Sequence, residues 1–125
     1  MVIMVIFADL NGLKRVNDEQ GHAAGDQILK TAASILGGVF YDTDVYRAGG
    51  DEFMILAQGM DEAELDLRLK RLYDQAKDAQ DLHFAVGTAI INKEDELHTA
   101  MRLADEGMYT NKRHYYENHP EKKYR

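Results

Sequence analysis

Two consecutive glycines, Gly49 and Gly50, separate two stretches of this chain that read as β-strands. Apolar and polar residues alternate before the glycines, and residues 53–57 after them are all apolar. A two-residue turn of a primed type needs positive φ at both central positions, and glycine provides it. The pair therefore predicts a tight β-hairpin with these glycines as its turn.

The acidic residues Asp51 and Glu52 follow the glycines directly, and a hairpin has no need of them. Adjacent carboxylates repel each other, and strands favour β-branched and aromatic residues. Two interpretations stay open. The acids either keep a solvated hairpin tip soluble or bind something outside the fold. Mg²⁺ is the leading candidate, because it takes hard oxygen ligands and bridges carboxylates to phosphates.

Length and composition restrict the class of protein. The 125 residues predict one domain, 1–125, with a single core. The absence of cysteine excludes disulfides and thiolate metal sites. No apolar run in these residues has membrane-spanning length, and residues 1–8 lack the features of a secretory signal. The net charge of −7 argues against a nucleic-acid-binding surface, although metals and backbone amides can still bind one anionic nucleotide.

Residues 1–8 form a continuous apolar run, which predicts a central strand buried on both faces of a covered sheet. The end of this strand would carry Asp9 to the rim of the sheet, where ligands gather. An aspartate after a strand is more often a turn former. Asp51 as a plausible neighbour makes a binding role for Asp9 the sharper hypothesis.

The remaining elements follow from hydrophobic periodicity. Residues 13–26 are polar and marked by glycine, which predicts a loop with one helical turn. From Asp26 onward the apolar spacing predicts an amphipathic helix that ends at Gly37 and Gly38, with Asp26 in its first turn. Its apolar positions are Ile28, Leu29, Ala32, Ile35 and Leu36.

Two more helices and a strand are expected after the hairpin. We expect Asp61 to cap a helix that has an apolar stripe and an otherwise solvated charged face. Residues 82–91 are expected to form a strand, in which Gly87 indicates a close approach of a neighbouring backbone. Asp95 or Glu96 opens the last helix, and residues 115–125 form a peripheral tail without a clear element. The apolar positions of the two helices are Leu65, Leu69, Leu72 and Ala76, then Leu97, Met101, Ala104 and Met108.

Three motifs in this order resemble the GGDEF family of diguanylate cyclases. They are Asp9 at a strand end, the run Leu13-Lys14-x-x-Asn17-Asp18-x-x-Gly21-His22-x-x-Gly25-Asp26, and Arg47-x-Gly49-Gly50-Asp51-Glu52-Phe53. The stretch Ala104-Asp105-x-x-Met108-Tyr109-x-x-Lys112 is similar to the family's C-terminal signature. The resemblance implies an α+β fold, palm-like as in adenylyl cyclases and ferredoxin-like domains, with a mostly antiparallel central sheet flanked by helices.

The resemblance also implies an activity. Family members condense two GTP molecules into cyclic di-GMP and release pyrophosphate, with two domains facing each other in a homodimer and Mg²⁺ or Mn²⁺ as cofactor. Carried over to this chain, the metal ligands are Asp9, Asp51 and the carbonyl of Leu10. Asp51 is the favoured acceptor of the 3′-hydroxyl proton and Glu52 assists, although the division of roles between these two acids stays open.

The substrate contacts implied by the resemblance lie in three other segments. The amides of Gly12 and Leu13 bind the β- and γ-phosphates, and Lys112 places a cation on them. Asn17 and Asp26 read the guanine base, because a carboxylate accepts hydrogen bonds from both N1–H and the 2-amino group. Asp26 therefore predicts a preference for GTP over ATP.

The chain departs from the family pattern at several positions. Phe40 and Thr43 replace the family's inhibitory Arg-x-x-Asp, so product inhibition there is not expected. Tyr116 replaces an arginine of the family pattern, so that either triphosphate binding is weaker or Arg113 substitutes for it. A lead-in segment that the family carries before the first strand is absent. These departures keep an alternative open, namely an inactive GTP-binding regulatory or protein-interaction module. The resemblance further implies an upstream sensory or coiled-coil module and a cytoplasmic location, alone or within a membrane-anchored protein.

Overall fold

A computed structural model describes residues 2–80, 82–93 and 96–122 of the chain. Its elements are β1 (Ile3–Leu10), α1 (Leu13–Gln20), α2 (His22–Val39), β2 (Asp44–Gly49), β3 (Glu52–Gln58), α3 (Glu62–Gln80), β4 (Phe84–Ile91), α4 (Leu97–Asn118) and η2 (Pro120–Lys122). None of the helices within these described ranges combines the length and the hydropathy required to span a membrane.

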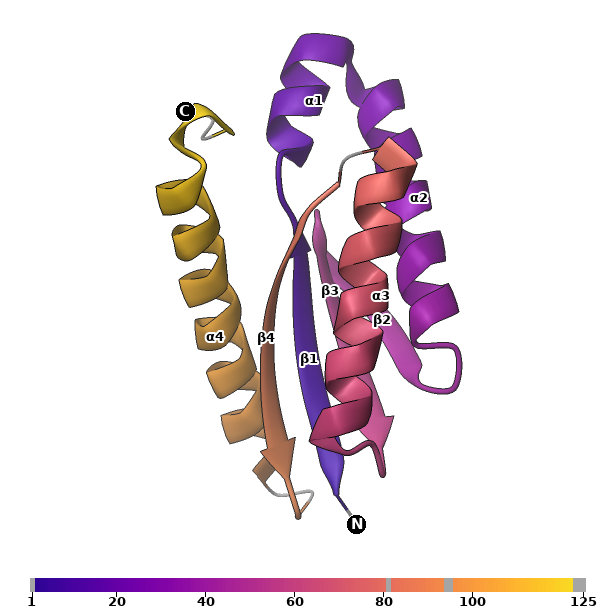
Figure 1. Ribbon diagram of the computed structural model, residues 1–125, viewed down its shortest axis with the longest axis vertical. Helices are drawn as coiled ribbons and strands as arrows, with labels where there is room; N and C mark the ends of the chain where they lie inside the picture. Colours follow the sequence, from indigo (N-terminus) through magenta and orange to yellow (C-terminus); the bar gives the residue numbers. More distant parts are fainter. Residues whose placement is uncertain (1, 81, 94–95, 123–125) are drawn as a thin grey trace.

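The four strands form one antiparallel sheet in the order β2-β3-β1-β4 (Figure 1). β1 lies between β3 and β4, so that Ile6 has Ile55 as its partner on one side and Thr88 on the other. Seven of the eight residues of β1 are buried. The prediction of a buried central strand is confirmed, but Asp9 lies inside the strand rather than beyond its end.

Helices cover both faces of the sheet. α2 and α3 lie on one face and α4 lies on the other (Figure 1). Because side chains alternate along a strand, Met4 and Ile6 pack toward α2 and α3, whereas Val5 and Phe7 pack toward α4. Asp9 follows Phe7 by two residues, so its side chain lies on the face that α4 covers.

The hairpin turn lies one residue later than predicted. Gly49 still pairs with Glu52, after a register shift, and the two turn residues are Gly50 and Asp51. The guanidinium of Arg47 donates to the carbonyl of Gly50 from Nε at 2.9 Å and from Nη2 at 2.6 Å. These hydrogen bonds favour the shifted turn, which places Asp51 at the tip itself.

The prediction of a loop with one helical turn over residues 13–26 is wrong, because two helices occupy all of that stretch but Gly21. α1 fills its first eight residues, and α2 begins at His22. Asp26 therefore lies in the second turn of α2 rather than in its first. Gly21, with φ of 90°, makes the sharp corner that lets one helix follow the other almost immediately.

The expected helix end at Gly37 and Gly38 is also wrong. α2 continues to Val39, and the N–H of Phe40 donates to the carbonyl of Leu36 at 2.9 Å. Each glycine costs a helix about 1 kcal/mol relative to alanine. Burial of the Val39 and Phe40 side chains in the core outweighs this local cost, since full burial of a large apolar side chain contributes about 1.5–3 kcal/mol.

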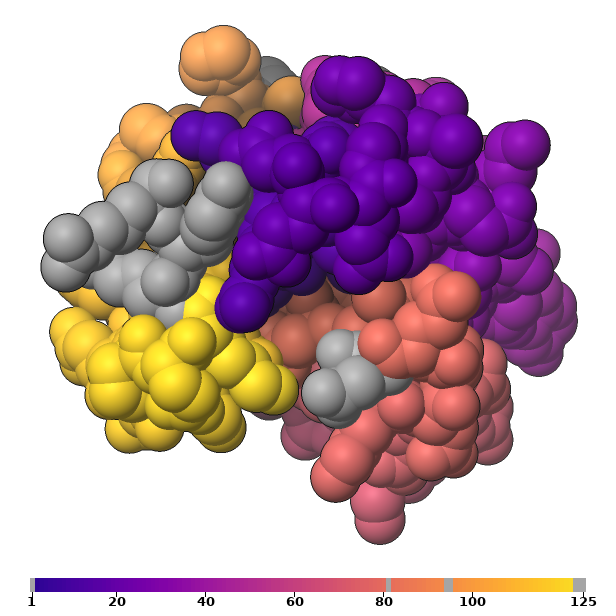
Figure 2. Space-filling view, turned by 90° about the horizontal axis from the view of Figure 1, so that it is seen from above, coloured from indigo at the N-terminus to yellow at the C-terminus, as the bar shows by residue number. Residues whose placement is uncertain are grey.

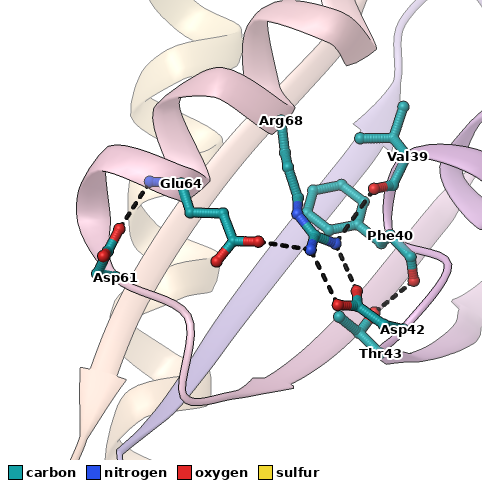
Figure 3. A network of polar contacts seen from close by, with 7 residues as sticks. All are labelled: Val39, Phe40, Asp42, Thr43, Asp61, Glu64 and Arg68. Carbon is teal, nitrogen blue, oxygen red and sulfur yellow. Dashed lines mark hydrogen bonds and ion pairs between the residues drawn. The ribbon is translucent and has the colours of Figure 1, made fainter.

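The cap of α3 is confirmed, since the N–H of Glu64 donates to Oδ1 of Asp61 at 2.8 Å. The predicted solvated charged face of this helix has one exception. Arg68 is only 5% exposed and donates to both carboxylate oxygens of Asp42, at 2.6 and 3.0 Å, and to Glu64 at 2.7 Å (Figure 3). Arg68 thereby ties α3 to the loop that follows α2.

The expected close approach at Gly87 is confirmed. A Cβ atom added there would lie 1.9 Å from the carbonyl oxygen of Ala104, so glycine lets α4 pack directly on β4. Glu96 precedes α4 without making a side-chain cap, and Asp95 lies outside the described residues. The prediction that residues 115–125 hold no clear element is wrong for the first part of this tail, because α4 continues to Asn118 and a short 3₁₀ turn follows.

Candidate active site

Asp9 is the most deeply buried acid of the site, with 6% of its surface exposed. The Nζ atom of Lys112 donates to its Oδ2 at 2.9 Å, and its Oδ1 is buried with no hydrogen-bond partner among the described residues. Burial raises the pKa of Asp9 to about 6; the hydrogen bond from Lys112 opposes this shift, and the nearby Asp51 carboxylate adds to it. The site therefore contains a buried carboxylate oxygen without a hydrogen-bond partner among the described residues.

Lys112 belongs to α4 and supplies positive charge beside these acids. Burial alone would lower the pKa of its ammonium, but the hydrogen bond and charge of Asp9, together with the charge of Asp51, raise it. Lys112 is consequently protonated at neutral pH. The sequence predicted that it binds phosphate, whereas in this structure it pairs with an expected metal ligand.

The hairpin tip brings two further acids to the same place. The N–H of Leu10 donates to the carbonyl of Asp51 at 2.9 Å, which anchors the tip beside the end of β1. Glu52 pairs with Asp9 across β3 and β1. Burial raises the pKa of Glu52, and the charges of Asp105 and Asp51 add to the effect. Negative charge thus accumulates where β1 and the hairpin meet.

A divalent metal ion fits this arrangement. Within the described ranges no three His, Cys, Asp or Glu side chains group closely enough to cage an ion. Mg²⁺ does not need such a cage, because it is commonly bound by one or two carboxylates together with waters and substrate phosphates. The unpartnered Oδ1 of Asp9 and the carboxylate of Asp51 match that donor set, and Leu10, whose carbonyl is the third predicted ligand, follows Asp9 in the chain.

A pocket of about 400 Å³ lies beside these acids, between the start of α1, the hairpin tip and α4. It is lined by Gly12, Leu13, Lys14, Arg15, Asp51, Tyr109, Lys112, Arg113 and Tyr116. The start of a helix presents backbone N–H groups without intrahelical partners, which favours anions. With four basic side chains on its wall, the pocket suits a polyphosphate group, and it unites four of the residues predicted from sequence: Gly12, Leu13, Asp51 and Lys112.

The two predicted base-reading residues do not line this pocket. Asn17 packs against Gly25 so closely that a Cβ atom there would lie 1.7 Å from Oδ1 of Asn17. Asp26, the next residue, lines a separate hollow of about 270 Å³ together with Arg47 and Phe53. Asn17 and Asp26 are thus near each other across the α1–α2 corner, on a different part of the surface from the pocket.

The positions of the missing inhibitory motif are structural. Phe40 is fully buried, and the Oγ1 of Thr43 donates to the Phe40 carbonyl at 2.8 Å. Neither residue offers a charge to a ligand. Tyr116 and Arg113 both line the pocket of about 400 Å³, and the substitution of Arg113 for the missing arginine stays a prediction.

Sequence reasoning missed a polar contact next to the pocket. The side-chain amide of Asn11 donates from Nδ2 to Nδ1 of His83 at 2.7 Å, and the His83 ring stacks on Tyr115 with centroids 3.8 Å apart. The contact joins residues 72 positions apart, so no local pattern could have revealed it.

The family model described as "Diguanylate cyclase, GGDEF domain" matches residues 1–118. The chain belongs to the GGDEF family. Diguanylate cyclase DosC of Escherichia coli is 30% identical over 125 residues, which cover 89% of this chain and 26% of DosC. Cyclic di-GMP phosphodiesterase PdeR of the same species is 33% identical over 121 residues, 86% of this chain and 18% of PdeR. This GGDEF chain therefore spans only about a fifth to a quarter of the length of these two curated relatives.

Solved structures agree with the fold. The GGDEF domain of DgcB from Caulobacter crescentus, in complex with c-di-GMP, has a TM-score of 0.83 at 23% identity, covering 90% of this chain and 72% of that chain. The GGDEF domain of YfiN (TpbB) from Pseudomonas aeruginosa has a TM-score of 0.81 at 27% identity, covering 90% and 77%. The predicted α+β fold with a mostly antiparallel sheet is thus confirmed as a GGDEF fold.

Proposed function

We propose that this GGDEF domain is a magnesium-dependent diguanylate cyclase that joins two GTP molecules into cyclic di-GMP. The observation that carries the proposal is the buried, unpartnered Oδ1 of Asp9, beside the Asp51 tip and a basic pocket of polyphosphate size. A protein keeps an unsatisfied buried carboxylate oxygen at a cost in stability, and binding a cation is a reason to keep it.

Each half of the reaction exchanges one phosphorus–oxygen bond for another. The 3′-oxygen of one GTP bonds to the α-phosphorus of the other, the bond from that phosphorus to the bridging oxygen breaks, and pyrophosphate leaves. Asp51 accepts the 3′-hydroxyl proton and Glu52 assists it. A bound Mg²⁺ supplies charge neutralisation of the triphosphate and lowers the pKa of the attacking hydroxyl. Asp9, Asp51 and the Leu10 carbonyl would hold this ion.

Substrate binding involves the pocket and the α1–α2 corner. The amides of Gly12 and Leu13 bind the terminal phosphates, and the ammonium of Lys112 moves from Asp9 to these phosphates. Arg113 adds positive charge in place of the arginine that Tyr116 replaces. Asn17 and Asp26 read the guanine edge.

Two domains are required, because each presents one GTP to the other. We propose a homodimer with two-fold symmetry, assembled in the cytoplasm through an attached sensory or coiled-coil module. The same scheme is possible when the chain is the cytoplasmic part of a membrane-anchored protein.

A second candidate function is a GTP-binding regulatory or protein-interaction module without turnover. Two observations favour it. Tyr116 lines the phosphate pocket where the family pattern has an arginine, and PdeR, a relative over 18% of its length, is named for a phosphodiesterase activity instead. In this alternative the site binds nucleotide as a signal.

The deciding experiment incubates the protein at high concentration with GTP and Mg²⁺ and separates the products by chromatography. Asp51→Ala removes the proposed base, and Asp44→Ala removes an exposed acid of the same hairpin as a matched control. Cyclic di-GMP from the wild type and Asp44→Ala but not from Asp51→Ala supports the cyclase. GTP binding without product supports a GTP-binding regulatory module, and no nucleotide binding contradicts both the cyclase and that module and leaves only protein interaction.

A further inference from the structure

The turn between β1 and α1 is anchored to a single residue of a distant segment. The backbone N–H of Asn11 donates to the carbonyl of His83 at 2.9 Å, and its side-chain Nδ2 donates to His83 Nδ1 at 2.7 Å. The pair of hydrogen bonds fixes both the position and the orientation of Asn11. Gly12 and Leu13, which follow directly, are the residues proposed to bind phosphate.

This anchor replaces the usual helix cap. The N-cap of α1 is Gly12, with φ of 87°, and no side-chain hydrogen bond caps the helix. Glycine in this position adopts the positive φ that the turn requires but has no side chain of its own to fix the orientation of the turn. The direction in which the first N–H groups of α1 point is therefore set by what holds the preceding residue, Asn11.

His83 itself is held by aromatic stacking. Its ring lies 3.8 Å from the Tyr115 ring and 6.0 Å from the Tyr73 ring, in both cases at 14° between planes. Burial lowers the pKa of His83 to about 4, with the charges of His119 and Lys122 adding to the effect. The ring is thus neutral at physiological pH, and its Nδ1 can accept the hydrogen bond from Asn11.

The stack also links the two walls of the phosphate pocket. Tyr115 and Lys112 belong to the same helix, α4, whereas Gly12, the N-cap of α1, lies on the other wall of the pocket. Viewed from above, α1, the end of α4 and the end of α3 converge at this end of the molecule (Figure 2). A hollow of about 430 Å³ borders Gly12 there, with Asn11, His83 and Tyr115 among its lining residues.

We propose that His83 is a positioning residue for the phosphate-binding turn, acting through Asn11 to aim the N–H groups of Gly12 and Leu13. This inference rests on the proposed function only in taking nucleotide phosphates as the ligand of that turn. His83 itself contacts no reacting atom. Its effect is on nucleotide affinity, through the direction of the two amides.

The test is a double-mutant cycle read by binding of a non-hydrolysable GTP analogue with Mg²⁺. His83→Phe keeps an aromatic ring against Tyr115 but removes the acceptor, and Asn11→Ala removes the donor. We expect each to weaken binding about three- to tenfold, the equivalent of one lost hydrogen bond, and the double variant to be no weaker than either. His83→Gln, whose side-chain oxygen can accept, restores part of the affinity. Tyr46→Leu, at an exposed tyrosine of β2 on the opposite edge of the sheet from β4, serves as the control and binds as the wild type does.

Amide hydrogen exchange of residues 10–16, measured without nucleotide, separates this inference from the proposed function. We expect faster exchange of the Asn11 amide in His83→Phe and no change in Tyr46→Leu. Unchanged exchange, or additive losses of affinity in the cycle, overturns the positioning role. Failure of the wild-type protein to bind the analogue overturns the proposed function instead, whatever the exchange result.

Discussion

The Nζ atom of Lys112 and the Oδ2 atom of Asp9 lie 2.9 Å apart, although 103 positions separate them in the chain. The ammonium neutralises a buried carboxylate that has a second, unpartnered oxygen. An ion pair at this place keeps the acid site folded, and a metal ion with its phosphates can take over the same charge. Stability and ligand binding are therefore coupled at Asp9.

Replacing Lys112 by methionine should leave the Asp9 charge buried without its partner. We expect Lys112→Met to lower the free energy of unfolding by about 1–3 kcal/mol at pH 8, the cost of an unsatisfied buried polar group. Urea denaturation measures this change, and Lys70→Met, at an exposed lysine of α3, is the control. Adding Asp9→Asn to Lys112→Met should recover much of the loss. No recovery would mean that the methionine disturbs packing rather than charge.

The sequence could predict the ingredients of this site but not their pairing. Asp9, the hairpin acids and the strand that leads to Asp9 follow from local patterns. Asp9 and Lys112 come into contact because each lies on a buried face of its element. Asp9 is on the same face of β1 as Phe7, and Lys112 is on the same face of α4 as the buried Met108. Both faces can be read from the sequence, but only packing of α4 on β1 brings them together.

The burial of Arg68 could have been predicted from its position in the sequence. It lies three residues after Leu65 and four before Leu72, and therefore falls on the apolar stripe of α3. A charge at such a position must be paired when the helix packs. Its partner Asp42 is in a loop, where no periodicity could have indicated it. The predicted end of α2 at Gly37 and Gly38 is wrong for a related reason. Glycine disfavours helix locally, but burial of Val39 and Phe40 in the core outweighs that preference.

Arg68→Met should destabilise the fold without affecting the nucleotide site. The substitution removes paired hydrogen bonds to Asp42 and one to Glu64 while retaining an apolar stem. We expect a loss of about 2–4 kcal/mol of unfolding free energy, because the buried cation and its acids act as a unit. Arg71→Met, at an exposed arginine of the same helix, should change it by less than about 0.5 kcal/mol. Chemical denaturation of the two variants gives the comparison, and equal midpoints would refute the structural role.

The contact of β4 with α4 makes a second stability prediction. Gly87→Ala would place Cβ 1.9 Å from the Ala104 carbonyl oxygen and 2.2 Å from the Met108 nitrogen, so α4 must move away. We expect a loss of more than about 3 kcal/mol, since both neighbours are backbone atoms that cannot rotate aside. Gly38→Ala is the matched control, because nothing lies within 4 Å of its Cβ position. It should stabilise the helix by about 0.5–1 kcal/mol, and thermal melts that rank the two variants the other way would contradict the packing.

The neutral state of His83 predicts a pH dependence of stability. Its pKa is about 4 in the folded protein and 6.5 when the ring is exposed, so the unfolded chain binds the proton more tightly. Stability from His83 is complete above pH 6.5 and declines as pH falls toward 4, by up to about 3 kcal/mol. Asp9, with its pKa raised to about 6, contributes a slope of the opposite sign. The difference between wild type and His83→Gln, measured by urea titrations at pH 7.5 and pH 4.5, isolates the histidine, and a constant difference would reject its buried neutral state.

Asp26→Ser tests which nucleobase the domain reads. The carboxylate of Asp26 can accept hydrogen bonds from N1–H and the 2-amino group of guanine together, and adenine offers no such pair of donors. Loss of a bidentate contact costs about 1–3 kcal/mol of discrimination, so the preference for GTP over ATP should fall by about tenfold or more. Competition binding with both nucleotides measures the ratio. Asp78→Ser, at an exposed acid of α3, controls for net charge and should leave the ratio unchanged.

Binding of inorganic triphosphate separates base recognition from other roles of Asp26. Because Asp26 lies outside the pocket proposed for the phosphates, affinity for inorganic triphosphate should be the same in the Asp26→Ser variant and the wild type. A parallel loss of triphosphate binding would assign Asp26 to charge or folding instead of base recognition.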